Sequence, residues 1–201
     1  MSDEASGYRY DVFISYPRSG AGNVGPWVHN HFHPLLLNCL ADELPQDPEI
    51  FIDTRQEFGG YWPATLANAL RRSRVLVPVW SPKYFSSRWC LAEWRTMMAR
   101  EQVLDLAGDR QPIGIIYPVV FSDSETFPDE ARCRQARDLK RWAVPCEEYR
   151  KTNGYVGLHE AVREIAIELA TRLRQVPPWQ PGWPDLRPDP PLPPPADPPM
   201  L

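Results

Sequence analysis

Four apolar runs of strand length, separated by segments with helical periodicity, most strongly constrain the fold of this chain. The runs are YDVFISY (10–16), EIFID (49–53), RVLVPVW (74–80) and IGIIYPVVF (113–121). Their nearly continuous apolar character is typical of strands that are covered on both faces, as in a parallel sheet. A fifth, weaker strand is expected around RWAVPC (141–146). Pro78 and Pro118 lack a ladder donor, so each should lie near a strand end or a bulge.

The segments between these runs predict helices. Residues 158–173 place five apolar side chains on one stripe, namely Leu158, Val162, Ile165, Leu169 and Leu173. A helix at 63–72 begins with a proline, and a helix at 24–44 must bend or restart at Pro34. Ser81, and then Ser86 or Ser87, are predicted N-caps of two further helices. This alternation predicts a doubly wound α/β fold, a flavodoxin-like five-stranded parallel sheet of order 2-1-3-4-5 flanked by helices.

Composition changes sharply after residue 176. The segment from Pro177 to Leu201 holds half of the 24 prolines of the chain. Proline cannot donate helix or ladder hydrogen bonds, so we expect a disordered, extended tail at 176–201. The folded domain is then expected at 8–175, after a flexible N-terminus at 1–7.

The charge and cysteine content exclude several classes of protein. The net charge of −4 argues against nucleic acid or an anionic membrane as the main partner. The first residues are polar and acidic, and no apolar run approaches the roughly 20 residues of a membrane span, so we expect a cytoplasmic protein. The four cysteines form no CxxC pair, which favours reduced and mostly buried thiols. His29 and His33 share a helix face, but Pro34 and the lack of nearby carboxylates argue against a metal site.

The segment SSRWCLAEW (86–94) places Trp89 and Glu93 one helical turn apart, on the same face. In a sheet of order 2-1-3-4-5, ligands bind beyond the carboxyl ends of strands 1 and 3. Strand 1 ends at Ser15 and Tyr16, and the third strand leads directly into the segment that carries Glu93. A solvated glutamate beside a packed tryptophan is the alternative interpretation.

The motifs YDVFISY, FIDTRQEFGGYW and SPKYFSSRWCLAEW, at their spacing here, resemble the TIR (Toll/interleukin-1 receptor) domain of bacteria and plants. The resemblance covers about residues 8–175. Some members of that family are assembly modules, and others cleave NAD⁺ between nicotinamide and ribose. The cleaving members carry a glutamate four residues after a tryptophan on this helix, which Glu93 and Trp89 match. An aromatic at the end of the loop after strand 2 matches Trp62, and an arginine after strand 1 matches Arg18.

The resemblance therefore implies an NAD⁺ glycohydrolase or ADP-ribose cyclase with Glu93 as its catalytic residue, NAD⁺ as substrate, and no cofactor or metal. The pyridinium is already a good leaving group, so one carboxylate that stabilises the developing oxocarbenium charge can suffice. The residues expected to contact the substrate are Phe13, Ser15, Tyr16, Arg18, Asp53, Gly60, Trp62, Ser81, Tyr84 and Trp89. Trp62 has packing, and Arg18 a surface charge, as alternative roles.

The resemblance further implies a bacterial immune (antiphage) role and self-association with other TIR domains. An activating sensor or a downstream effector protein is the further partner expected, and activation is expected from that sensor or from assembly through the loop at 53–62. A non-enzymatic module that recruits other TIR domains is the alternative function, and an enzyme acting on another nucleotide is a third. The sequence leaves open whether water or the adenine reaches the anomeric carbon first, that is, whether the product is hydrolysed or cyclised.

Overall fold

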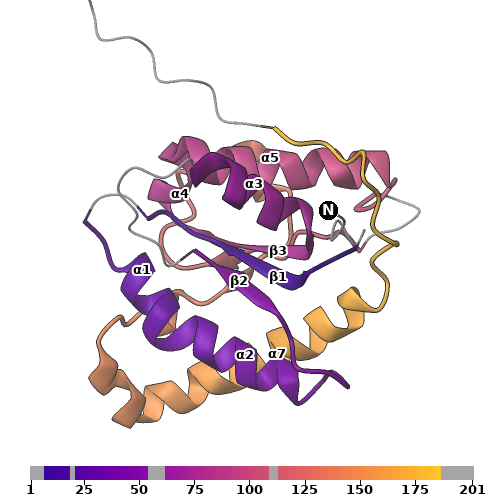
Figure 1. Cartoon of the computed structure of the whole chain (residues 1–201). Helices are drawn as coiled ribbons and strands as arrows, with labels where there is room; N and C mark the ends of the chain where they lie inside the picture. Colours follow the sequence, from indigo (N-terminus) through magenta and orange to yellow (C-terminus); the bar gives the residue numbers. More distant parts are fainter. Residues whose placement is uncertain (1–6, 19–20, 54–61, 109–112, 187–201) are drawn as a thin grey trace, which may run out of the picture.

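The computed structural model describes residues 7–18, 21–53, 62–108 and 113–186, and these form one parallel sheet between two layers of helices (Figure 1). The strand order β2-β1-β3-β4-β5 confirms the predicted topology. The strands are β1 (Tyr10–Ser15), β2 (Ile50–Ile52), β3 (Ser73–Trp80), β4 (Val119–Val120) and β5 (Arg137–Asp138). The helices are α1 (Val24–Trp27), the π-helix η1 (Val28–Phe32), α2 (His33–Ala41), α3 (Trp62–Arg71), α4 (Pro82–Ser86), α5 (Arg88–Val103), α6 (Asp129–Arg132), the 3₁₀ helices η2 (Lys140–Trp142) and η3 (Glu147–Lys151), and α7 (Asn153–Leu173).

The strands separate two hydrophobic cores because successive side chains point to opposite faces of a sheet. Val12 and Ile14 enter the core shared with α1, α2 and α7. Phe13 enters the core shared with α3 and α5. The near-continuous apolar sequence of β1 is therefore explained by burial on both faces, as predicted.

The predicted helical stripe and proline positions are also confirmed. All five stripe residues of α7 are 4% exposed or less. Pro34 lies at the junction of η1 and α2. Proline has no amide hydrogen to donate to the carbonyl four residues earlier, that of Asn30, and this carbonyl accepts a hydrogen bond from Arg150 instead. Pro78 pairs with Ser15 at the last position of the β1–β3 ladder, and the two residues after Pro78 pair with β4. Pro118 directly precedes β4.

The fifth strand lies at Arg137–Asp138, so the prediction of a strand at 141–146 is wrong. The amides of Arg137 and Leu139 donate to the carbonyls of Pro118 and Val120, and η2 follows at once. The apolar side chains of 142–144 pack on the core around α2 and α7 instead of forming a ladder.

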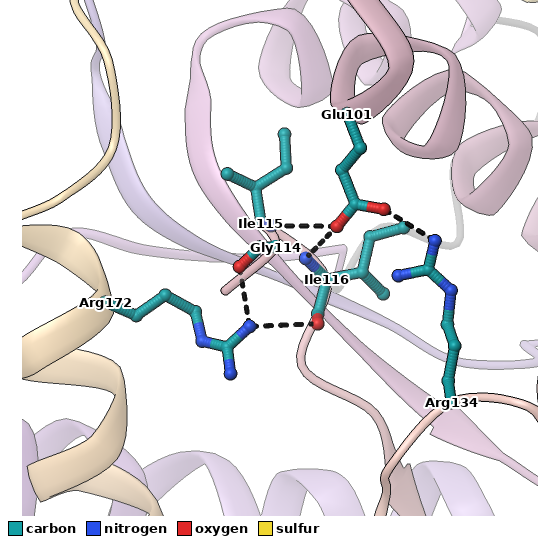
Figure 2. Close-up of polar contacts among 6 residues, drawn as sticks. All are labelled: Glu101, Gly114, Ile115, Ile116, Arg134 and Arg172. Carbon is teal, nitrogen blue, oxygen red and sulfur yellow. Dashed lines mark hydrogen bonds and ion pairs between the residues drawn. The ribbon is translucent and has the colours of Figure 1, made fainter. Parts of the chain in front are cut away.

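The fourth strand is shorter than the predicted run at 113–121. The amides of Ile115 and Ile116 donate to the carboxylate of Glu101, which takes the place of a strand partner (Figure 2). Only an isolated bridge from Leu76 to Ile116 precedes β4. The continuous ladder with β3 is confined to Val119–Val120.

The start of the proline-rich segment is docked on the domain, which contradicts a disordered tail from residue 176. Residues 177–186 form no helix or strand, as expected, but Trp183 is 5% exposed and Trp179 donates to the Arg71 carbonyl at 3.2 Å. The apolar surface of the two indoles opposes the entropic cost of ordering this segment. Residues 187–201, and 1–6 at the other end, lie outside the described residues.

The cysteine prediction holds only in part. The four thiols are free, but Cys133 and Cys146 are exposed, whereas Cys39 and Cys90 are buried. None of the helices in the described ranges is both long and apolar enough to span a membrane.

Candidate active site

The candidate site lies where β1 and β3 end and α5 begins. Ser15 is two residues after Phe13, so strand alternation turns it toward α5, while Tyr16 turns toward α1. Ser87 caps α5 by accepting a hydrogen bond from the Cys90 amide at 3.4 Å, and Ser81 caps α4 by accepting from the Tyr84 amide at 3.3 Å. Ser81 was the predicted cap of α4, and Ser87 is one of the two serines, with Ser86, that the sequence offered for α5.

Glu93 is 6% exposed and lies against the end of β1. Ser15 Oγ is 2.5 Å from Glu93 Oε2 and 3.0 Å from Tyr84 Oη, and Tyr84 Oη is 3.2 Å from the Cys90 carbonyl. A hydroxyl has one proton, so this chain depends on the state of Glu93. Ser15 donates to an ionised Glu93, whereas a protonated Glu93 donates to Ser15, Ser15 to Tyr84, and Tyr84 to the carbonyl.

Burial dominates the electrostatics of this cluster. It raises the pKa of Glu93 to about 7, against the opposing effects of the Ser15 hydrogen bond and the Arg18 charge. Burial also raises the pKa of Cys90 and of Tyr16 to about 12 each. Glu93 is thus balanced between its two protonation states at neutral pH, while its neighbours Tyr16 and Cys90 keep their protons.

A second group of predicted residues lies beside this cluster. Arg18 forms an ion pair with Asp53, and Tyr16 Oη is 2.7 Å from the Asp53 carbonyl and 2.8 Å from His29 Nε2. Burial lowers the pKa of His29 and favours its neutral form. These contacts join the ends of β1 and β2 to η1, which carries His29.

The remaining predicted residues occupy different environments. Phe13 is 1% exposed and stacks on Phe51 at 4.9 Å, so it supports Ser15 from the core instead of facing solvent. Trp89 is partly buried in the first turn of α5 and packs against the α3–α5 core. Gly60 and the side chain of Trp62 lie outside the described residues, so their roles stay predictions.

Two contributions were missed by the sequence analysis. His29 was considered only as a metal ligand, but its ring lies against Tyr16 with centroids 5.6 Å apart. The Cys90 carbonyl accepts from Tyr84 within the first turn of α5, which no side-chain pattern indicates. In the described part of the chain, no three His, Cys, Asp or Glu side chains cluster as metal ligands do.

The arrangement provides one carboxylate at the carboxyl edge of the sheet, a hydroxyl that orients it, and a nearby guanidinium. An ionised Glu93 can accept hydrogen bonds from ligand hydroxyls and stabilise a positive charge that develops next to it. Arg18 can contribute to the binding of an anionic group while it is held by Asp53.

Comparison with protein families identifies one family. The sequence profile of the family described as TIR domain matches residues 12–151. The chain is 23% identical over 191 residues to TMV resistance protein N of Nicotiana glutinosa, which covers 87% of this chain and 16% of that protein. It is 28% identical over 148 residues to the probable 2′ cyclic ADP-D-ribose synthase BdTIR of Brachypodium distachyon, covering 73% of this chain and 58% of that protein. The chain thus spans less than two thirds of either relative.

Solved structures with detectable likeness include the TIR domain of the Toll-related receptor TRR-2 of Hydra magnipapillata. That match has a TM-score of 0.45 and 19% identity, and covers 77% of this chain and 98% of the other. The TIR domains of the activated Roq1 resistosome, which directly recognises the pathogen effector XopQ, match with a TM-score of 0.40 and 24% identity over 81% and 84% of the two chains.

Proposed function

The chain belongs to the TIR domain family, and on that premise we propose that it cleaves NAD⁺ at the bond between nicotinamide and ribose, with Glu93 as the catalytic residue. The observation that carries the proposal is the position of Glu93. It is a buried carboxylate at the predicted ligand-binding edge of the sheet, hydrogen-bonded to Ser15, with a pKa of about 7. The similarity to a protein named as a probable cyclic ADP-ribose synthase supports the same reaction class.

In the proposed reaction, the C–N bond breaks and its electron pair neutralises the nicotinamide ring, so the leaving group needs no proton. The ribose becomes oxocarbenium-like, and the Glu93 carboxylate stabilises that charge while accepting hydrogen bonds from ribose hydroxyls. Addition of water then gives ADP-ribose and one proton. Addition of a nucleophile from the same ADP-ribose gives a cyclic product and one proton.

The other predicted residues have supporting roles in this proposal. Ser15 holds the Glu93 carboxylate, and Tyr84 in turn holds Ser15. Arg18, oriented by Asp53, is assigned to the diphosphate, and Trp89 and Trp62 to the planar rings. Tyr16 links the Asp53 backbone to His29 and so connects the phosphate side of the site to η1.

We also propose a cytoplasmic, bacterial antiphage setting in which self-association with other TIR domains, or a sensor, activates the enzyme. The proposed gate, the loop between Asp53 and Trp62, lies outside the described residues. Specific activity that rises with protein concentration would support activation by assembly. Constant specific activity of a strict monomer from nanomolar to high micromolar protein would contradict it.

The decisive experiment is Glu93→Gln with NAD⁺ as substrate and mass spectrometry of the products. Loss of the carboxylate should lower the cleavage rate by about 10²–10³ while the fold is retained. Glu160→Gln, which changes an exposed carboxylate on α7, is the matched control and should keep full activity. The products distinguish hydrolysis from cyclisation in the same measurement.

The alternative, a recruiting module without catalysis, makes a different prediction. It requires that wild-type protein at high concentration gives no product above the Glu93→Gln background, although it assembles with other TIR domains. A product from another nucleotide, with NAD⁺ left intact, would favour the third possibility.

A further inference from the structure

Residues 177–186, which we call the strap, run from the end of α7 to α5, the helix that carries Glu93 (Figure 1, yellow). The strap also contacts the segment before β1, because Tyr8 donates to the Pro177 carbonyl at 2.9 Å and its ring lies 5.4 Å from that of Trp183. It therefore ties both ends of the domain to one helix.

Glu93, Thr96 and Arg100 lie on one face of α5, because their spacings of three and seven residues return to nearly the same angle around a helix. The three side chains are 6%, 3% and 0% exposed. This buried stripe is polar, so its hydrogen bonds, as well as apolar packing, determine the setting of the helix. Glu93 contacts β1, whereas Thr96 and Arg100 contact the strap.

Thr96 joins the strap through a reciprocal pair of hydrogen bonds. The Leu186 amide donates to Thr96 Oγ1 at 3.1 Å, and the Thr96 hydroxyl donates to the Leu186 carbonyl at 3.3 Å. One side chain thus satisfies both backbone groups of a strap residue, only one helical turn from Glu93.

Trp183 covers a buried cation. The Arg100 guanidinium donates to the carbonyls of Ser73, Leu70 and Arg71, at 2.8, 3.2 and 3.3 Å, and lies 4.1 Å from the centre of the Trp183 ring. The indole excludes water and adds a cation–π contact, which is stronger when the cation is desolvated. Loss of the indole would hydrate Arg100 and weaken the bonds that hold α5 to the start of β3.

We propose that the strap positions Glu93, with Thr96 and Trp183 as positioning residues that fix the rotation and axial setting of α5 and thereby the contact between Glu93 and Ser15. A contact of 2.5 Å tolerates little movement, because hydrogen bonds weaken steeply outside their preferred geometry. A misplacement of about 1 Å can lower a catalytic rate about 10²-fold. The catalytic part of this inference rests on the proposed function.

The test compares two disruptive variants with two conservative ones. Thr96→Val removes both Leu186 contacts at nearly constant shape, and Thr96→Ser keeps the hydroxyl. Trp183→Ala removes the ring, and Trp183→Phe keeps an aromatic face over Arg100. None of the four changes the ionisable groups near Glu93, which are Arg18 and Tyr16 beyond β1, Tyr84 of α4, and Cys90 of α5.

Two readouts are required: kcat and KM for NAD⁺, and the pH at which Glu93 titrates. The titration is measured without catalysis, from the unfolding free energy of each variant against its Glu93→Gln counterpart across pH. Thr96→Val and Trp183→Ala should lower kcat about tenfold or more with KM within about twofold. They should also shift the pH at which Glu93 titrates away from its wild-type value, because a weakened Ser15 hydrogen bond raises the pKa of the carboxylate and water that reaches it lowers that pKa. Thr96→Ser and Trp183→Phe should restore both values.

The inference is overturned if hydrogen exchange shows the strap released while kcat and the titration keep their wild-type values. Should wild type itself cleave no NAD⁺, the proposed function fails, and the titration alone still decides whether the strap positions Glu93. If Trp183→Ala does not fold, the milder Thr96 pair decides the question.

Discussion

Helix α5 buries two glutamates about two turns apart, and their surroundings are opposite. Glu101 is 2% exposed, and its Oε1 accepts from the Ile115 and Ile116 amides at 2.8 and 3.1 Å. Its Oε2 accepts from Arg134 at 2.6 Å (Figure 2). Among the described residues, Glu93 has one hydrogen-bonded partner, Ser15, although it is almost as deeply buried.

The difference shows that pairing, rather than burial, distinguishes a structural carboxylate from a candidate catalytic one. The partners of Glu101 come from the segment before β4 and from the segment between α6 and β5, so this side chain fastens the sheet edge to α5. Arg172 of α7 holds the same segment from the other face of the sheet, because it donates to the Gly114 carbonyl at 2.5 Å (Figure 2). Within the described residues, Glu93 keeps acceptor capacity that no hydrogen bond besides that of Ser15 uses.

The largest expected effect is on stability, at Glu101. Glu101→Ala leaves two buried amides and Arg134 without their acceptor, so the free energy of unfolding should fall by about 3–5 kcal/mol. Urea denaturation measures this. Arg134→Ala should cost less, because the arginine is 23% exposed and the two amides keep their acceptor. A loss below about 1 kcal/mol in Glu101→Ala would remove the contrast between the two glutamates.

Gly114→Ala tests the same contact, between Glu101 and the segment before β4, by a change in that segment. A Cβ at this position would lie 2.2 Å from Glu101 Oε1, so the carboxylate or the segment before β4 must move. We expect a marked loss of stability that is smaller in the Glu101→Ala background, where the obstructing oxygen is absent, but not abolished there, because Ala107 Cβ still lies 2.9 Å from the new Cβ.

Removal of the Glu93 carboxylate should raise the stability of the protein, whereas removal of the Glu101 carboxylate should lower it. The size of the Glu93 effect depends on pH. The Glu93 pKa of about 7 in the folded protein is above the ordinary 4.5, so the folded state binds the proton more tightly. The unfolded chain ionises first as pH rises, and the carboxylate therefore lowers stability progressively between about pH 4.5 and 7. Glu93→Gln should be more stable than wild type above pH 7, by up to about 3 kcal/mol, and the gain should vanish near pH 4. A gain of equal size at pH 4 would exclude ionisation as its cause.

The position of Glu93 at the carboxyl edge of the sheet could be predicted because three signals coincide there, while its catalytic role stays a prediction. The apolar runs indicate where β1 and β3 end, the serines at 81 and 87 indicate where helices begin, and the parallel topology brings these ends together. This placement predicts that Glu93 lies near Ser15. The exposed fraction of Glu93 and its distance from Ser15 cannot be obtained from a sequence pattern.

Glu101 could not have been identified in the same way. It stands in AREQV near the end of a helix, which is typical of a solvated surface, and its partners are backbone amides with no signature of their own. The strand at Arg137–Asp138 was missed because it is two residues long and both side chains are charged, so it has no apolar run. Trp183 was missed because proline-rich composition predicts an extended tail, whereas docking depends on two tryptophans and on the cation beneath one of them.

Catalysis should follow the ionisation that distinguishes Glu93. If its carboxylate must be ionised, kcat/KM for NAD⁺ should rise about tenfold between pH 6 and pH 8, with an apparent pKa near 7. Initial rates in buffers of constant ionic strength measure this. A flat profile across that range would show that the ionisation of Glu93 does not limit the reaction, and would make its underpaired state irrelevant to function.

The smallest predicted effect is a pKa shift that separates the two interactions which lower the pKa of Glu93, while burial raises it. The Ser15 hydrogen bond and the Arg18 charge both lower its pKa, and the Ser15 effect is the larger. Arg18 is 23% exposed and is also paired with Asp53, so solvent screens its charge. Arg18→Gln should therefore raise the pKa of Glu93 by about half a unit or less, and Ser15→Ala should raise it further. Both shifts are read from the pH dependence of stability against the matching Glu93→Gln variants, because Arg18→Gln also changes substrate binding. Added salt should weaken the Arg18 effect and leave the Ser15 effect in place. If Arg18→Gln instead gives the larger pKa shift, Arg18 acts as a distant ion-pair partner of Glu93. Glu93 and Glu101 would then differ in how far away their charged partner lies, and not in whether they have one.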